Sequence, residues 1–279
     1  MRLNCAGREL DLTTPVVMGV LNVTPDSFSD GGRFVDLTAA LAHADAMIAA
    51  GASVIDVGGE STRPGASSVS ADDELRRVLP IIDALVSRGA VVSIDTSKPE
   101  VIRAALAAGA HLVNDVRALQ QPGALEAAAS GSAAICLMHM QGEPATMQQA
   151  PTYGDVVEEV IGFLRTRIEA CRKAGIGLDR MLVDPGFGFG KTLDHNLALL
   201  RNLPKISAAT NAPILAGLSR KSMLGALTGR GVDERLAGSL ALAFAALEGG
   251  ARIIRCHDVV ETCDVVKVWA ALRGGGGSA

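Results

Sequence analysis

Polar and charged residues stand at the ends of short apolar runs throughout this sequence. Eight runs rich in Val, Ile and Leu end in this way, and the residues at or just beyond their ends include Asn22, Asp95, Asn114, Asp184, Lys221, Arg255 and His257. Carboxylates and amides can pair with the N–H donors of a flat heterocycle, whereas arginine suits phosphate or diphosphate oxygens. We therefore expect a site for a ligand that combines a donor-rich ring with a polyanion.

The runs alternate with helical patterns, which is typical of βα units around a parallel sheet. Eight such units predict an α/β fold of the (β/α)8 TIM-barrel type. The expected strands are Val16 to Leu21, Ser53 to Val57, Val91 to Ile94, Leu112 to Val113, Ala133 to Met138, Met181 to Val183, Ile214 to Leu218 and Ile253 to Ile254. In such a barrel the carboxyl ends of the strands share one face, where active sites lie. The polar strand-end residues should thus line one cavity.

The chain length favours a single domain. Its 279 residues fit one barrel of roughly 250 residues. We expect one barrel domain over 1–273 and a flexible Gly/Ser tail or a cloning remnant over 274–279.

Composition and charge exclude several classes of partner. The net charge of −4 argues against a surface for nucleic acid or acidic membranes, although it leaves room for a local basic cluster inside the cavity. No apolar run reaches the roughly 18 residues of a membrane span, so we expect a cytoplasmic protein with no membrane partner. The five cysteines lack the spacing of a zinc or redox site and are expected to be reduced thiols in the core.

Three helix features can be predicted from the local sequence pattern. Ser97 to Glu100 has the spacing of a capping box with an early proline, and it predicts a helix start. Leu37, Leu41, Ala44 and Ile48 form an apolar stripe that should pack on the barrel. Val259 to Leu272 is expected to be the closing helix.

Several familiar catalytic patterns fail on spacing. Gly190-Lys191-Thr192 imitates a phosphate-binding loop, but the glycine that the motif requires five residues earlier is Pro185. The first strand ends without the His-x-His of a metal hydrolase, and neither His139 nor His257 has a Ser or Cys partner at triad spacing. Lys221 could form a Schiff base, but binding of an anion is at least as natural there.

Long segments of the chain resemble the dihydropteroate synthase family of folate biosynthesis. The resemblance covers about Val16 to Val266 and rests first on Met18 to Gly32 and Asp56 to Gly65, which look like two family signatures. Shorter matches follow in order at Ser93 to Thr96, Asn114-Asp115, Leu137 to Met140, Asp184 to Lys191, Ser219 to Ser222 and Arg255 to Asp258. No departure occurs at a functional position.

The resemblance implies a transferase that forms a C–N bond. It condenses 6-hydroxymethyl-7,8-dihydropterin diphosphate with 4-aminobenzoate to give 7,8-dihydropteroate and pyrophosphate. The pterin set that it implies is Asp95, Asn114, Met138, Asp184, Phe189, Gly217 and Lys221. The diphosphate set is Asn22, Thr62, Arg63, Arg255 and His257, and the aminobenzoate set is Phe28, Pro64, Phe189, Lys221 and Ser222. Arg63, Lys221, Arg255 and Asp30 are the residues implied to be catalytic.

Magnesium is the one cofactor that the resemblance implies, with Asn22 as its protein ligand. One amide oxygen is plausible because Mg²⁺ usually binds together with substrate phosphates. The Gly-, Ser- and Pro-rich segments 24–34 and 62–70 should be mobile loops that close over diphosphate and create the aminobenzoate pocket. Binding would then be ordered. Fold physics alone would also permit a phosphate, rather than the aminobenzoate carboxylate, at the helix that starts near Ser222.

Two other functions compete with the synthase. A methyltransferase acting on methyltetrahydrofolate would not need the Ser-Thr-Arg-Pro segment 61–64, and a non-catalytic pterin-binding protein could lose Arg63 or Lys221. Both features are present, so the synthase is favoured. The resemblance further implies sulfonamides as competing ligands and a homodimer formed through helices near the chain's end.

Overall fold

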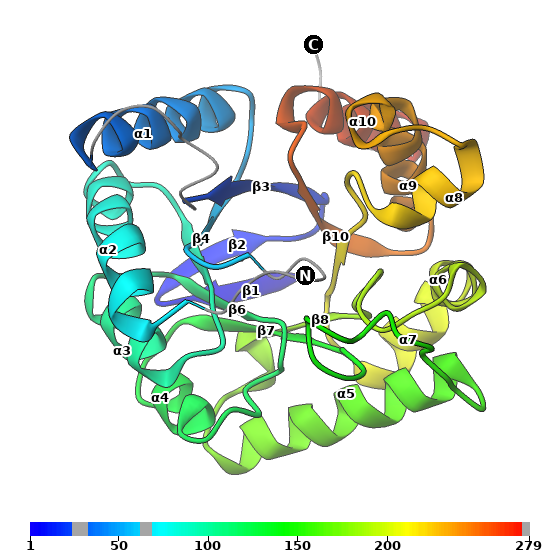
Figure 1. Cartoon of the computed structure of the whole chain (residues 1–279), viewed down its shortest axis with the longest axis horizontal. Helices are drawn as coiled ribbons and strands as arrows, with labels where there is room; N and C mark the ends of the chain where they lie inside the picture. Colours follow the sequence, from blue (N-terminus) through cyan, green and yellow to red (C-terminus); the bar gives the residue numbers. More distant parts are fainter. Residues whose placement is uncertain (24–32, 62–68, 275–279) are drawn as a thin grey trace.

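The computed structural model describes residues 1–23, 33–61 and 69–274. It shows a closed barrel of eight parallel strands with helices around it (Figure 1). In order around the ring, the strands are β3 (Val16–Asn22), β4 (Val54–Gly58), β5 (Val92–Asp95), β6 (Leu112–Asp115), β7 (Ala134–Met138), β8 (Met181–Asp184), β9 (Ile214–Gly217) and β10 (Ala251–Cys256), and β10 pairs with β3. The predicted TIM barrel is confirmed, and predicted and observed strand ends differ by only a few residues.

The outer ring is made of helices that alternate with the strands. They are α1 (Arg33–Ala49), α2 (Ala71–Ser87), α3 (Pro99–Ala107), α4 (Ala124–Ala129), α5 (Val156–Lys173), α6 (Leu193–Arg201), α7 (Leu203–Thr210), α8 (Ser222–Thr228), α9 (Leu236–Glu248) and α10 (Val259–Leu272), with short 3-10 turns at Leu178–Arg180 and Val232–Glu234. The closing helix α10 has the predicted bounds. Among the helices in these ranges, none combines the length and apolar character needed to cross a membrane.

The predicted apolar stripe of α1 is confirmed at three of its four residues. Ala44 is fully buried and Leu37 and Leu41 pack against the core, but Ile48 is exposed. The most buried described residues of α1 are Ala40, Ala44 and Met47, which follow one another at the helical spacing of four and three residues.

The predicted capping box at Ser97 is wrong. The N-cap of α3 is Lys98, whose side chain makes no capping bond, and Pro99 is the first helical residue. The Ser97 hydroxyl donates instead to the carboxylate of Asp115 at the end of the neighbouring strand. The Ser97 hydroxyl therefore bonds to a residue distant in sequence and does not cap the helix.

A hairpin at the N-terminus closes the bottom of the barrel, and the sequence pattern had not indicated it. Strands β1 (Arg2–Cys5) and β2 (Arg8–Asp11) are antiparallel, and both turn residues between them, Ala6 and Gly7, have positive φ, which suits a two-residue hairpin turn. Buried hairpin residues pack on the inward-facing layer of the barrel, which consists of Met18, Val54, Leu112, Ala134, Cys136, Leu182, Leu215 and Ile253.

The larger part of the core lies between the barrel and the helices. All five cysteines, which fall within the described ranges, are buried and form no disulfide, as expected. A tightly packed lower barrel and helix layer hold the strands rigidly, so the inward-facing residues near their carboxyl ends have fixed positions.

Candidate active site

Strand register brings the predicted polar residues to one level of the barrel mouth. Asn22 pairs with Gly58, Gly58 with Asp95, and Asp95 with Asn114 across four neighbouring strands. Side chains two residues apart on a strand point to the same side. Asn114 and Asp184 therefore face inward, because each comes two residues after a residue of the floor, Leu112 and Leu182.

An ion-pair network joins three strands inside the mouth. Arg255 donates from Nε to Oδ2 of Asp56 at 2.6 Å and from Nη2 to Oδ2 of Asp95 at 2.7 Å. Asn114 Nδ2 donates to the same oxygen of Asp56 at 3.1 Å. The sequence-predicted pterin residues Asp95 and Asn114 and the predicted diphosphate residue Arg255 thus belong to one hydrogen-bonded cluster.

Asp56 is a site residue that sequence reasoning missed. It is fully buried in the middle of β4, two residues beyond the floor residue Val54. The signal was available: a carboxylate inside a Val-Ile-Asp-Val run is costly to bury unless it is paired. Oδ1 of Asp56 and Oγ of Ser93 have no hydrogen-bond partner within the described ranges, so polar groups here can still accept a ligand or water.

Charge in this cluster is balanced by close contacts. Burial alone would lower the pKa of Arg255, but the carboxylates of Asp56 and Asp95 outweigh it and raise that pKa, so the guanidinium stays charged. Burial raises the pKa of Asp95 to about 7, although Arg255 opposes the shift. Asp95 consequently takes up a proton near neutral pH.

Asp184 ends β8 beside Met138, its register partner on β7. Its Oδ1 accepts from the Gly186 amide at 2.7 Å. A Cβ placed on Gly217 would lie 3.9 Å from Oδ2 of Asp184, so the glycine keeps that oxygen accessible. Burial raises the pKa of Asp184, while the Gly186 amide and the charge of Lys221 act against the shift.

Lys221 lies over the face of Phe189. Its Nζ is 4.2 Å from the ring centroid, which is a cation–π contact between the loop that follows β8 and the residue that precedes α8. Burial lowers the pKa of Lys221 to about 8, and the charge of Asp184 acts in the opposite direction. The predicted grouping of Asp184, Phe189 and Lys221 is therefore present.

Other residues near the site lie on the rim of the barrel, beyond the carboxyl ends of β9 and β10. Nδ1 of His257 is 3.1 Å from Oγ of Ser219. Next to it, Arg220 pairs with Asp258, its Nε 3.1 Å from Oδ2. Ser222 is exposed at the first position of α8. Five predicted residues lie outside the described ranges: Phe28, Asp30, Thr62, Arg63 and Pro64.

The magnesium prediction can be tested for fit at Asn22. A Cβ on Gly58 would lie 3.6 Å from Oδ1 of Asn22 and 3.9 Å from Oδ2 of Asp95. The glycine thus leaves room beside oxygen atoms of both side chains. No group of three or more His, Cys, Asp or Glu residues in the described part of the chain could hold a metal. A hard cation that brings most of its ligands with the substrate fits this sparse oxygen set.

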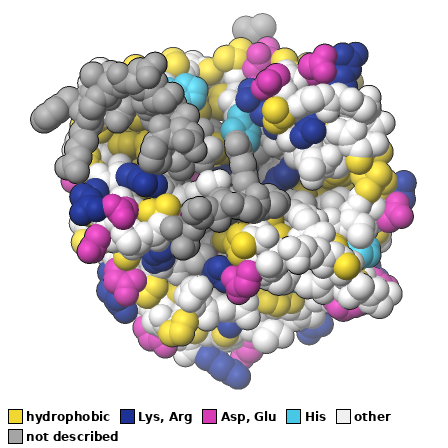
Figure 2. Space-filling model, in the orientation of Figure 1, with side chains coloured by type: hydrophobic (Ala, Val, Ile, Leu, Met, Phe, Trp, Pro, Cys, Tyr) yellow, Lys and Arg dark blue, Asp and Glu magenta, His cyan; other side chains and the backbone are white. Residues whose placement is uncertain are grey.

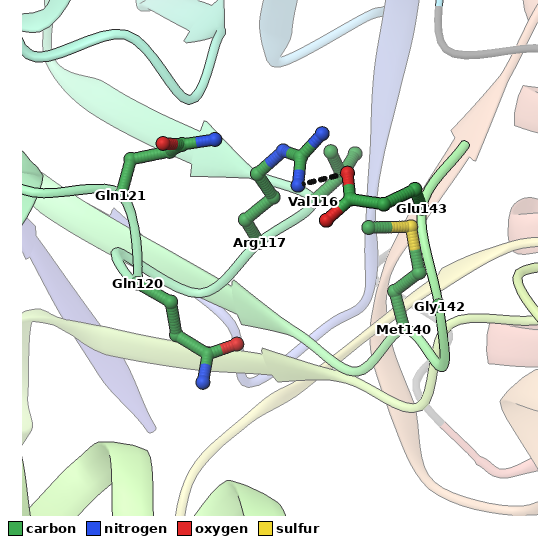
Figure 3. Close-up of a pocket in the computed structure, with 7 residues that line it drawn as sticks. All are labelled: Val116, Arg117, Gln120, Gln121, Met140, Gly142 and Glu143. Atoms are coloured by element: carbon green, nitrogen blue, oxygen red, sulfur yellow. Dashed lines mark ion pairs between the residues drawn. The ribbon is translucent and has the colours of Figure 1, made fainter. Parts of the chain in front are cut away.

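A hollow opens beyond the carboxyl ends of β6 and β7. It has a volume of about 280 Å³ and lies between the segments that follow β6 and β7, where Arg117 Nη1 and Glu143 Oε2 are 2.5 Å apart (Figure 3). None of the predicted site residues lines it. Figure 2 shows acidic and basic side chains interspersed on the face of the molecule seen in Figure 1.

A buried lysine near the mouth was also missed. Lys191, which looked like the end of a failed phosphate-binding motif, is almost fully buried with its Nζ 3.0 Å from Nδ1 of His139. Burial and the nearby charge of Lys191 lower the pKa of His139 to about 3, so this histidine is neutral. Strand register could not reveal the pair because Lys191 stands in a loop.

Comparisons with known proteins place the chain among enzymes that bind pterins. Residues 18–257 match the family described as "Pterin binding enzyme". The chain is 55% identical over 269 residues to dihydropteroate synthase of Escherichia coli (strain K12), covering 96% of this chain and 95% of that protein.

Solved structures agree over nearly the whole length. The Yersinia pestis dihydropteroate synthase, in a sulfonamide drug complex, is 51% identical with a TM-score of 0.93, covering 98% of this chain and 100% of that one. The Burkholderia cenocepacia dihydropteroate synthase, complexed with 7,8-dihydropteroate, is 49% identical with a TM-score of 0.89, covering 98% and 97%.

Proposed function

This chain belongs to the pterin-binding enzymes and, within them, to the dihydropteroate synthases, and from that premise we propose how its residues carry out the reaction. A C–N bond forms between the arylamine of 4-aminobenzoate and the methylene carbon of the pterin substrate. The C–O bond to the diphosphate breaks, pyrophosphate leaves with the bonding electrons, and the arylamine loses a proton. The observation that carries this proposal is the convergence of buried acids, an amide and two cations at one barrel mouth.

The pterin ring lies among Asp95, Asn114 and Asp184. Asp184 accepts hydrogen bonds from a ring N–H and from the exocyclic amine, a pair of donors that an ionised carboxylate matches and a neutral amide cannot. The buried side chain of Met138 and the open backbone at Gly217 give the flat ring room on either side of that carboxylate. Asp56 takes part by holding Asn114 and Arg255 in place.

The diphosphate binds toward Arg255, His257 and Asn22, together with Thr62 and Arg63. The contacts of Arg255 with Asp56 and Asp95 use Nε and one N–H of Nη2. The guanidinium has five N–H donors, so others are available to phosphate oxygens. As the leaving group gains negative charge these contacts strengthen, which lowers the barrier selectively.

Magnesium would be held by Oδ1 of Asn22 and by diphosphate oxygens. When bound, it would neutralise part of the charge on the departing diphosphate. The single amide ligand implies weak binding of the metal in the absence of substrate.

The aminobenzoate lies between Phe189, Lys221 and Ser222, with Phe28 and Pro64 assigned to the same pocket. Lys221 lies against the ring of Phe189 and can bind the carboxylate. A neutral arylamine is already a nucleophile, so the site needs no strong general base. Asp30 and Arg63 complete the catalytic set by resemblance.

A second copy of this chain is the proposed partner for the outer surface of α9 and α10. A hollow of about 360 Å³ lies there, lined by Leu240, Phe244, Glu261, Asp264, Val265 and Val268. Val260 and Val268 are more than half exposed beside it. Apolar residues around such a hollow favour a symmetric contact.

The free thiols support a cytoplasmic location.

The synthase reaction is tested by mixing the protein with pterin diphosphate and Mg²⁺, with and without 4-aminobenzoate. Pyrophosphate release in equal amount to dihydropteroate, dependent on the arylamine and inhibited competitively by a sulfonamide, is the expected result. Methyl transfer from methyltetrahydrofolate, or pterin binding without turnover, would contradict the proposal.

A further inference from the structure

The glycine-rich segment that follows β8 is fixed to the end of β7 by one buried ammonium group. Lys191 Nζ lies 2.9 Å from the carbonyl oxygen of Phe189, 3.3 Å from that of His139 and 3.0 Å from Nδ1 of the His139 ring. An ammonium group has three N–H donors, and each finds an acceptor here. The group is therefore fully hydrogen-bonded although it is almost fully buried.

All three acceptors are neutral. The pKa of His139 is lowered to about 3, so its ring stays uncharged and Nδ1 can accept from the lysine. Burying an ammonium group without a carboxylate in contact is costly. Burial lowers the pKa of Lys191 to about 7, so the ammonium form predominates only below neutral pH.

The segment is also confined from other sides. Gly186 has a φ of +72°, and a Cβ there would lie 1.8 Å from the carbonyl oxygen of His139, so only glycine permits this approach. Tyr153 donates its hydroxyl to the Gly190 carbonyl at 2.8 Å, and Asn196 accepts from the Gly188 amide at 2.8 Å. Phe189, whose ring supports Lys221 at 4.2 Å, is carried on this fixed segment.

We propose that Lys191 is a positioning residue of the synthase site, which fixes the main chain at His139 and Phe189 and so holds the aromatic ring under Lys221. It touches neither substrate in this assignment and acts through Phe189. The inference rests on the proposed function, because Phe189 and Lys221 are the residues assigned to both substrates.

Lys191 also acts on Asp184 through its charge. The cations that act on Asp184 are Lys221 before α8, Lys191 in the segment after β8 and Arg255 on β10, and each favours the ionised carboxylate. The buried Cys136 thiol on the neighbouring strand β7 also interacts with Asp184, but burial raises its pKa, so it stays neutral. Burial lowers the pKa of Lys191 and the charge of Lys221 adds to the shift, while the charge of Asp184 acts against it and stabilises the ammonium form. Removing the Lys191 charge should therefore raise the pKa of Asp184, the proposed pterin acceptor.

Two variants separate geometry from charge. Lys191→Met removes both the donors and the charge, whereas Lys191→Gln removes the charge and keeps an N–H donor. We expect the acid limb of kcat/KM for pterin diphosphate to move to higher pH in both. In Lys191→Met we also expect a rise of about ten- to a hundredfold in KM for 4-aminobenzoate, because Phe189 and Lys221 lose their alignment.

Lys173→Met, which removes an exposed lysine on α5, is the matched control and should behave like wild type. If Lys191→Met does not fold, Lys191→Gln still decides the proposal, because its amide has only two N–H donors for the three acceptors and KM for 4-aminobenzoate should rise above the wild-type value. Folded variants with wild-type pH profiles and KM values would overturn it. So would activity reduced equally at every pH with unchanged KM, which indicates a structural role. A wild-type protein that makes no dihydropteroate would instead refute the proposed function.

Discussion

Replacing Asp184 with asparagine should remove most of the recognition of the pterin ring. The asparagine can still accept from the Gly186 amide, which is 2.7 Å from Oδ1 in the native protein. The atom in place of Oδ2, near Gly217, would then be an NH2 group that faces the N–H donors of the pterin. A hydrogen bond to a charged partner contributes about 1.5–3 kcal/mol, which is about ten- to a hundredfold in affinity.

Isothermal titration with 6-hydroxymethylpterin at pH 8 measures this loss directly. Asp83→Asn, which changes an exposed carboxylate on α2, provides the matched control. Because burial raises the pKa of Asp184, wild-type affinity should fall as the pH is lowered through that pKa, whereas the asparagine variant should show a flatter profile. Wild-type affinity in Asp184→Asn would refute the assignment of this carboxylate to the ring donors.

Three further predictions concern stability, proton uptake and binding order. Lys98→Met should lower the free energy of unfolding in urea by about 3–5 kcal/mol, because Lys98 Nζ is 2.5 Å from Glu74, which is fully buried, and 2.6 Å from Glu60. Lys205→Met, at an exposed ion pair, should cost much less, and equal losses in the two variants would contradict this prediction. The pKa of Asp95 is raised from 3.8 to about 7, so the folded protein holds a proton there that the unfolded chain has lost. The free energy of unfolding of wild type should therefore fall relative to that of Asp95→Asn as the pH rises from about 4 to about 7. A constant difference across that window would show that the pKa of Asp95 is not raised. Calorimetry should detect tighter binding of 4-aminobenzoate when pyrophosphate and Mg²⁺ are present, and equal affinity in their absence would reject ordered binding.

Strand positions were predictable because each buried strand is an apolar run that ends on a polar residue. Asn22, Asp95 and Asn114 were placed together on that basis, and their register confirms it. The N-terminal hairpin was not predicted, since its Ala6-Gly7 turn lacks the stronger Asn-Gly signal and its short strands resemble an irregular segment.

The parts of the site that escaped prediction depend on contacts between distant residues. Asp56 stands within a strand rather than at its end, so a search of strand ends passed over it. Lys191 stands in a loop, where no period fixes the direction of a side chain, and its partner His139 is 52 residues away in sequence. The hydroxyl of Ser97 likewise donates its hydrogen bond to a residue on strand β6, Asp115.

The most direct test of the whole account is a crystal structure of the protein with 7,8-dihydropteroate, pyrophosphate and Mg²⁺. We expect the pterin ring between Asp184 and Asn114, with Asp184 within hydrogen-bond distance of the ring N–H and the exocyclic amine, and pyrophosphate against Arg255. A pterin ring bound away from Asp184, or pyrophosphate on a different face from Arg255, would contradict the account.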